Sequence, residues 1–306
     1  MFLAGVEAEC LIHFLARVGV ESLRVYDRVV IWGVGLIGGS VGLALRKRGG
    51  SHRVIGLGRD RSRLDQAVAL GAIDAGTTDV ARACDGADLV VVATPVDQVA
   101  RCVIESARLS RSETLVTDAG SAKATIVAAV EKDAAARGMF VAAHPIAGSE
   151  RSGVAAARAD LFEGATCVLT PGAHTNATQL VEARAFWAGI GCRVIEMSPD
   201  EHDRALALTS HLPHAVAAAL ATVVPPELFP LAAGAYRDST RDAAADAALW
   251  AAILLQNSDE TLRALDQFGR ALADCRQLLA DHDQAGLEAW WHVAAANRRG
   301  FRGTQA

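Results

Sequence analysis

The sequence predicts an α/β fold class, with a doubly wound, mostly parallel sheet followed by an all-helical domain. Three observations support this. Short β-branched runs alternate with longer segments of helical period, a glycine-rich turn joins the first run to a helix, and strand signals stop near residue 198. Such alternation is typical of βαβ units and hence of a parallel sheet. We therefore divide the 306-residue chain into an extension (1–27), a sheet domain (28–198) and a helical domain (199–306).

Seven apolar, mostly β-branched runs are expected to form the strands. Between most of them lie segments such as "LIGGSVGLALRKRG" and "SAKATIVAAVEKDAAARG", which suit helices. Beyond residue 198, Ala, Leu, Asp and Gln dominate in helical periodicity, which "VVPPELFP" must interrupt. The expected strands are residues 28–34, 53–58, 88–94, 113–118, 139–144, 166–171 and 192–197.

Composition excludes several classes of protein. A hydrophobic content of 51% lets the chain bury a real core, and a net charge of −5 gives no broad basic field for nucleic acid. The six cysteines lie far apart without a C-x-x-C pair, so we expect no metal site, no disulfide framework and a reducing cytoplasm. The N-terminal extension lacks a basic start and an uninterrupted apolar run, so no membrane span is expected there.

The most informative single motif is "VVIWGVGLIGGS", which places G-x-G-x-x-G directly after a strand and before a helix. Gly33 permits a tight turn, Gly35 lets the backbone approach a pyrophosphate, and Gly38 allows close helix packing. Leu36 and Ile37 open the helix, whose N-terminal N–H groups favour an anion. The context predicts a Rossmann-type dinucleotide site.

The end of the second strand bears on the choice between NAD and NADP. An acidic residue usually contacts the adenosine ribose there, but this chain has Gly58, then Arg59 and Asp60. A small residue followed by arginine leaves space and charge for a 2′-phosphate, which slightly favours NADP. Asp60 keeps NAD open, and Arg59 could equally be a solvated helix-start residue. Thr94 and Pro95, at the carboxyl end of the run 88–94, are further candidate cofactor contacts or a plain strand terminator.

With these pieces assembled, the chain resembles the prephenate and arogenate dehydrogenase family of tyrosine biosynthesis. The resemblance covers residues 28 to about 260 and rests on "GVGLIGGS", "VTDAGSAK", "HPIAGSERSG", "LTSHLPH" and "YRDSTR…LW", in that order. It implies oxidative decarboxylation of a cyclohexadienyl substrate with hydride transfer to NAD(P)⁺, giving 4-hydroxyphenylpyruvate or tyrosine. It also implies a homodimer formed through the helical domain. Nothing in the sequence separates prephenate from arogenate.

The resemblance also implies the catalytic groups. His144 matches the histidine that hydrogen-bonds and deprotonates the ring hydroxyl, and a neutral imidazole suits that role near pH 7. Ser121 matches the serine that orients this histidine and touches the nicotinamide side. Judged on its own residues, a histidine before a proline at a strand end is more often a loop residue bonded to backbone.

Substrate contacts are implied in the helical domain. Ser210 and His214 are four residues apart and match substrate-side residues, with Pro213 predicting that a helix begins or bends there. Arg241 matches the arginine that binds a substrate carboxylate, and Asp238, three residues earlier, shares its predicted helix face. The alternative interpretations are a capped helix start and a surface ion pair of little energetic value.

Three further positions complete the implied site. Glu150 matches an acid that pairs with the arginine at position 241. Ser149 matches a small hydroxyl residue that contacts substrate. Trp250 matches an aromatic residue at the subunit boundary. By itself, Trp250 would be assigned to a helix core. The active site is then expected in the cleft between the two domains.

Two alternatives remain open at the level of sequence. Another two-domain hydroxy-acid or imine reductase would share the nucleotide motif but lack the "HPIAG" and "SHLPH" pair. A non-catalytic dinucleotide-binding sensor would bind cofactor without turnover, leaving those motif residues idle.

Overall fold

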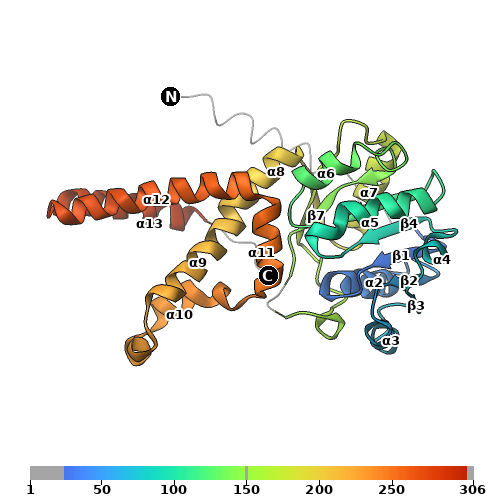
Figure 1. Ribbon diagram of the computed structural model, residues 1–306, viewed down its shortest axis with the longest axis horizontal. Coiled ribbons are helices and arrows are strands. Elements are labelled where there is room, and N and C mark those ends of the chain that lie inside the picture. Colours follow the sequence, from blue (N-terminus) through green and yellow to red (C-terminus); the bar gives the residue numbers. More distant parts are fainter. Residues whose placement is uncertain (1–23, 149–150, 302–306) are drawn as a thin grey trace.

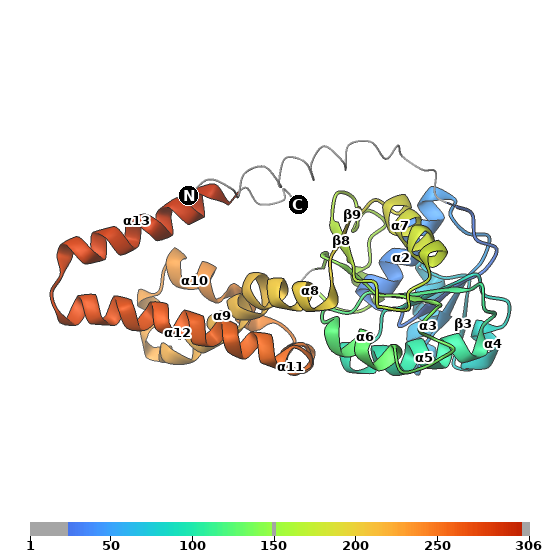
Figure 2. The ribbon, with the colours of Figure 1, turned by 90° about the horizontal axis from the view of Figure 1, so that it is seen from above.

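The computed structural model describes residues 24–148 and 151–301. It has two parts: a sheet with helices packed on it, and an arm of helices that extends to one side (Figure 1). Seen from above, the arm includes two long antiparallel helices, α12 and α13, at its far end (Figure 2). The fold class predicted from the sequence is confirmed.

The main sheet has six parallel strands in the order β3-β2-β1-β4-β5-β6. Because β1 pairs with β2 on one side and β4 on the other, the winding direction reverses at β1. Ligands of such sheets bind outside the carboxyl ends of the strands at this reversal. The strands are β1 (Val29–Trp32), β2 (Val54–Leu57), β3 (Ala75–Thr77), β4 (Leu89–Val92), β5 (Leu115–Asp118) and β6 (Phe140–Val141).

The central strands are buried on both faces, and their sequences are apolar except for Thr117 and Asp118 at the end of β5. Every residue of β1, β2, β4 and β5 is buried. Two apolar clusters lie on opposite faces: Val29 and Ile31 belong to one, Val30 and Trp32 to the other. The helices of this domain are α2 (Leu36–Arg48), α3 (Arg61–Ala69), α4 (Val80–Cys84), α5 (Val99–Leu109), α6 (Ala124–Val130) and α7 (Ala177–Gly189).

The predicted strand 139–144 is two strands in different sheets. β6 ends at Val141, and β7 (Ala143–Pro145) joins a three-stranded sheet with β8 (Thr166–Leu169) and β9 (Arg193–Glu196). Between them, Ala142 directs its carbonyl to the backbone N–H of Thr170. β7 is antiparallel to β8, so His144 stands opposite Val168 at the start of this second sheet.

The end of the predicted extension belongs to the folded domain. Tyr26 is 1% exposed, forms a parallel bridge with Ser51 and packs edge-on against Phe186. Arg24 pairs with Glu182 at 2.7 Å. The proposed boundary at residue 27 therefore lies a few residues inside the domain, and residues 1–23 lie outside the described part.

The helical domain begins with α8 (Pro199–Leu206), started by a capping box between Ser198 and Glu201. The helix does not begin at Pro213: it runs from Pro199 to Val223 through a π turn over Ala207–His211. Proline cannot donate the regular helical hydrogen bond, and the wider turn precedes it directly. The remaining helices are α9 (Leu212–Val223), α10 (Gly234–Thr240), α11 (Ala247–Gln256), α12 (Ser258–Ala280) and α13 (Gln284–Gly300).

Two helices of the arm touch the sheet domain. α8 packs on α6, and α11 packs on the short helix η1 (Val96–Gln98) that follows β4. Ile253 of α11 is 4% exposed and joins the same apolar cluster as Val96. The first helix of the second domain is therefore anchored to the carboxyl edge of the sheet.

Candidate active site

The glycine turn has the geometry that dinucleotide binding requires. Gly33 has φ +98°, and a Cβ there would lie 2.5 Å from the Ala93 carbonyl oxygen. A Cβ on Gly38 would collide with the Gly33 carbonyl oxygen, whereas one on Gly35 would meet no atom within 4 Å. Gly33 and Gly38 thus allow close packing, and Gly35 leaves open space above the backbone.

This open space is part of a pocket of about 730 Å³ at the carboxyl end of β1, β2 and β4. Gly35 precedes α2, and none of the described side chains caps this helix or places an acid in its first turn. Its N–H groups, beginning at Leu36 and Ile37, therefore remain available to an anion. These features fit a pyrophosphate, so the chain's residues suit a bound dinucleotide.

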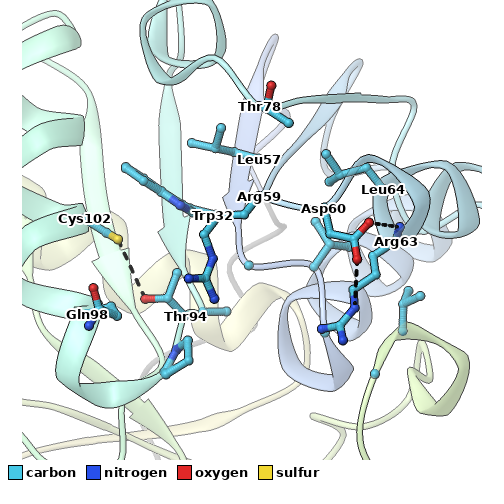
Figure 3. A pocket seen from close by; sticks show the side chains of 18 of the residues that line it. Trp32, Leu57, Arg59, Asp60, Arg63, Leu64, Thr78, Thr94, Gln98 and Cys102 are labelled. Atoms are coloured by element: carbon cyan, nitrogen blue, oxygen red, sulfur yellow. Dashed lines mark hydrogen bonds and ion pairs between the residues drawn. The ribbon is translucent and has the colours of Figure 1, made fainter.

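Arg59 and Asp60 differ in what they offer this pocket, which both of them line. The Asp60 carboxylate accepts hydrogen bonds from the N–H groups of Ser62 (2.9 Å) and Arg63 (3.3 Å), so it caps α3. Within the described ranges Arg59 has no hydrogen-bond or ion-pair partner, and Figure 3 shows its guanidinium pointing toward Thr94. The available charge in this part of the pocket is therefore positive.

Thr94 and Pro95 also line the pocket. The Thr94 hydroxyl lies 3.9 Å from the thiol of Cys102 (Figure 3). Pro95 precedes η1, against which α11 packs. This loop therefore connects the dinucleotide pocket to the helical domain.

His144 is half-buried, and its closest polar partner comes from the helical domain. Its Nδ1 lies 2.9 Å from Nε2 of His202, and Nδ1 of His202 lies 2.7 Å from Oδ1 of Asp203. His202 and Asp203 are 0% and 2% exposed. Burial, followed by the nearby His202 and Lys123, lowers the pKa of His144 well below its ordinary value, so the imidazole is neutral near pH 7.

Ser121 does not provide the expected hydrogen bond to His144. It lies half-buried in the loop between β5 and α6, and in the described part of the chain the ring of His144 bonds to His202 instead. The difference arises because α8 lies against α6 and brings His202 to the same edge as β7.

A buried ion pair holds the backbone just before His144. Lys123 and Asp118 are both fully buried and form a close ion pair. The Lys123 ammonium also donates to the Ala143 carbonyl oxygen (2.8 Å), and the second Asp118 oxygen accepts from the Ala143 N–H (2.9 Å). Both backbone polar groups of Ala143 are therefore fixed by this pair.

His214 and Trp250 form a second aromatic group at the domain junction. Their rings stack with centroids 3.5 Å apart, and Nδ1 of His214 donates to the Ser210 carbonyl oxygen at 2.9 Å. Ser210 lies in the π turn, a kind of turn that is frequent at functional sites. Trp250 also packs against the apolar cluster that contains Ile253, so these contacts lie within one chain.

Asp238 and Arg241 do not share a helix face. α10 ends at Thr240 and Arg241 begins a 3₁₀ turn, so the expected i, i+3 geometry is lost between them. Asp238 pairs with Arg237 (3.2 Å), while Arg241 pairs with Asp242 (3.3 Å) and its side chain is 80% exposed. The turn of Arg241 packs on α9, the helix that carries His214. Ser149 and Glu150 lie outside the described residues.

His202 and Asp203 are the site residues that the sequence analysis missed. They stand in "SPDEHDRAL", a polar helix start whose charged residues suggest exposure to solvent. The sequence pattern of the capping box, Ser198 with Glu201, predicts where the helix starts. No periodicity in the sequence indicates that His202 and Asp203, in the following turn, are buried.

Comparisons with known proteins agree with this geometry. Family models described as "Prephenate dehydrogenase, nucleotide-binding domain" and "Prephenate dehydrogenase, dimerization domain" match residues 41–196 and 198–292. Prephenate dehydrogenase of Bacillus subtilis is 37% identical over 90% of this chain and 76% of its own length.

Two solved structures share the architecture. Prephenate dehydrogenase from A. aeolicus, in complex with hydroxyphenyl propionate and NAD⁺, has a TM-score of 0.84 and 33% identity, covering 89% of this chain and 97% of its own. Synechocystis arogenate dehydrogenase has a TM-score of 0.77 and 26% identity, covering 89% and 99%. Sequence, fold and site geometry together show that this chain belongs to the prephenate dehydrogenase family.

Proposed function

We propose that the protein is an NAD(P)-dependent prephenate or arogenate dehydrogenase, in which His144 is the base. The observation that carries this proposal is the position of His144: its neighbour Ala143 is bonded to Asp118 at the carboxyl end of β5, in a domain whose glycine turn suits a dinucleotide, and burial lowers the pKa of the imidazole. Family membership supports the reaction class. The proposal extends to either substrate, because they differ only in a keto or amino group on the side chain.

His144 accepts the proton of the ring hydroxyl while hydride leaves the carbinol carbon. Bound NAD(P)⁺ supplies the hydride acceptor. The electron pair of the bond to the departing carbon dioxide returns to the ring, and the ring oxygen takes the proton back as a phenol. The protein contributes a positioned base and holds the reactants in contact.

Ser121 is proposed to touch the nicotinamide side, because it lies in the loop that follows β5 at this edge. Ser210, His214 and Trp250 are proposed to form the substrate wall, supported by their junction position and mutual contacts. Arg241, which is exposed and adjacent to α9, is proposed to bind a substrate carboxylate in a bidentate manner. Asp238, Ser149 and Glu150 are proposed as neighbours of that arginine.

The cofactor is proposed to be NADP in preference to NAD. Asp60 is occupied as the cap of α3, whereas Arg59 is available in the pocket. A guanidinium suits a 2′-phosphate, and no acid occupies the Gly58 position for a ribose hydroxyl. NAD⁺ is bound by the related A. aeolicus structure, so both cofactors belong in the test.

The helical domain is proposed to form a homodimer in the cytoplasm. It exposes large apolar side chains on α12 and α13, including Leu279 (58%), Trp291 (69%) and Val293 (63%). The stretch Pro199–Val223 is long and apolar enough to span a membrane by length and composition. However, its His202 and Asp203 are buried against the sheet domain, which argues against a membrane span. The exposed apolar side chains of α12 and α13 favour packing against a second copy.

One assay set tests the proposal. Reduced cofactor is followed by its absorbance with prephenate and with arogenate, each with NAD and with NADP. Turnover with at least one substrate is expected, with the higher kcat/KM for NADP. Cofactor binding without turnover of either substrate would contradict the proposal.

A further inference from the structure

The proposed base and two buried groups behind it form a continuous hydrogen-bonded series. Nδ1 of His144 meets Nε2 of His202 at 2.9 Å, and Nδ1 of His202 meets Oδ1 of Asp203 at 2.7 Å. His144 belongs to β7, and His202 and Asp203 belong to α8, so this series of hydrogen bonds crosses from one domain to the other. His202 and Asp203 are buried away from water, so these contacts determine which ring nitrogens carry protons.

Asp203 acts only as an acceptor. Its Oδ1 accepts from the backbone N–H of Lys123 (2.8 Å), and its Oδ2 accepts from the N–H of Ala124 (2.8 Å). By accepting from these two donors, the Asp203 carboxylate caps α6, which has no capping bond from the side chain of its own N-cap residue. Because both oxygens accept from backbone N–H groups, the carboxylate meets His202 as an acceptor, and that contact requires a proton on the histidine Nδ1.

The proton positions follow along this series. A neutral His202 with its proton on Nδ1 has a lone pair on Nε2, which can only accept. Nδ1 of His144 must then donate, which leaves Nε2 of His144 without a proton. We propose that His202 and Asp203 are positioning residues that hold His144 in the tautomer whose Nε2 accepts the substrate proton. The identity of that proton rests on the proposed function, whereas the tautomer does not.

The surrounding charges are compatible with this arrangement. Lys123 and Asp118, from the loop after β5 and from β5 itself, form their own buried ion pair beside the series. His211, on the π turn, faces Asn257, whose amide donates to Nδ1 of His211 (3.1 Å) and to the Asp203 carbonyl oxygen (2.7 Å). Desolvation lowers the pKa of His202, against the opposing effect of Asp203, so both rings are neutral near pH 7.

The series also accommodates the proton that His144 receives. A protonated His144 carries hydrogens on both nitrogens, so it continues to donate to His202 without any rearrangement. The Asp203 carboxylate then balances the new charge through the intervening ring. Removal of groups that orient metal-ligating histidines typically costs about 10- to 100-fold in affinity or activity, and we expect a loss of that order here.

Two substitutions of His202 separate its acceptor role from its packing. His202→Leu removes the acceptor and is expected to lower kcat about 10- to 100-fold, with KM and cofactor Kd changed less than about twofold. His202→Gln places an amide oxygen that can accept from His144, and should retain most of kcat. His174→Gln, at an exposed histidine paired with Glu131, is the matched control and should leave kcat unchanged. Equal losses in the Leu and Gln variants would overturn the acceptor role.

The tautomer is measured directly by ¹⁵N NMR of protein labelled at histidine, with the His144 signals identified from their loss in His144→Asn. The wild-type protein should show a protonated Nδ1 and an unprotonated Nε2 near pH 7, and His202→Leu should show exchange between tautomers. A protonated Nε2 in the wild type would overturn the proposal. Because this readout needs no substrate, it stands apart from failure of the proposed reaction, which would appear as absent turnover with the expected tautomer.

Discussion

The dinucleotide pocket and the histidine site are built in opposite ways. The pocket is formed by glycine backbone. A Cβ at Gly33 or Gly38 would collide with neighbouring backbone, and Gly35 leaves open space for a ligand. The histidine site presents a side chain held by other side chains, with His202 and Asp203 arriving from α8. The pocket thus depends on local chain geometry, whereas the histidine site depends on contacts between distant segments.

This difference predicts where each site is sensitive. Substitutions in the pocket should change cofactor affinity or choice, since the pocket holds a ligand. Substitutions around His144 should change turnover or folding, since that region controls a proton and buries charges. The following experiments test this separation.

The largest expected effect is on turnover after His144→Asn. Loss of the base is expected to lower kcat about 10²- to 10⁴-fold, because a positioned general base contributes in that range. Cofactor Kd, measured by fluorescence titration, should stay within about twofold. His52→Asn, at an exposed position, is the control. A variant with wild-type kcat would remove His144 from the mechanism.

Folding should respond strongly to Lys123→Met. The substitution leaves Asp118 buried without its ion-pair partner, and breaking a buried pair destabilises a protein by about 3–5 kcal/mol. Denaturant unfolding measures this change. Lys47→Met breaks the exposed pair with Glu163 and should change stability by less than about 1 kcal/mol. Similar losses of unfolding free energy in both variants would mean that the buried pair stabilises the fold no more than the exposed pair does.

Substrate binding should weaken in Arg241→Gln. Loss of a charge-assisted hydrogen bond of about 1.5–3 kcal/mol is expected to raise KM about 10- to 100-fold. The neighbouring Arg237→Gln, which breaks an exposed pair with Asp238, is the matched control and should leave KM nearly unchanged. Steady-state kinetics decides between them, and equal effects would contradict the assignment of Arg241.

Cofactor choice should shift in Arg59→Ala. We expect kcat/KM for NADP to fall about tenfold or more and that for NAD to change little, because only NADP carries the 2′-phosphate. Gly58→Asp is the reciprocal variant and should favour NAD. A Cβ at this position would make only ordinary contact with Leu64, at 3.5 Å, so the side chain has room. An unchanged preference in both variants would place the determinant elsewhere.

The smallest effect concerns stability at acid pH. Burial lowers the pKa of His211 to about 4, so the unfolded chain binds its proton first as pH falls. This contribution to stability is complete above about pH 6.5 and is lost as pH falls from there toward 4. His211→Asn should reduce the dependence of unfolding free energy on pH, and His52→Asn should not. If the unfolding free energy of His211→Asn depended on pH as strongly as that of the wild type, other groups would account for the loss of stability at acid pH.

Much of the sheet domain could be predicted because short, continuous stretches of sequence determine its strands and its glycine turn. Unbroken β-branched runs identified β1, β2, β4, β5, β8 and β9, and the glycine spacing identified the turn after β1. β3 was missed because Ala75–Thr77 is short and has small residues with no apolar run. The run 139–144 was assigned to one strand because periodicity carries no information about which sheet a strand enters.

The surroundings of His144 could not be predicted in the same way. Its partner His202 lies 58 residues further along the chain, in a helix start rich in charged residues. Local pattern predicts such residues to face solvent, and only the docking of α8 on α6 reverses this. The prediction that Asp238 and Arg241 share a helix face was wrong for a related reason, because the helix that would align them ends at Thr240.

Asp203 belongs to the helical arm, yet its carboxylate terminates α6 of the sheet domain. Pulling α8 away would leave the backbone N–H groups of Lys123 and Ala124 without these acceptors and would separate His202 from His144. We therefore expect any motion that admits substrate to keep α8 in contact with α6.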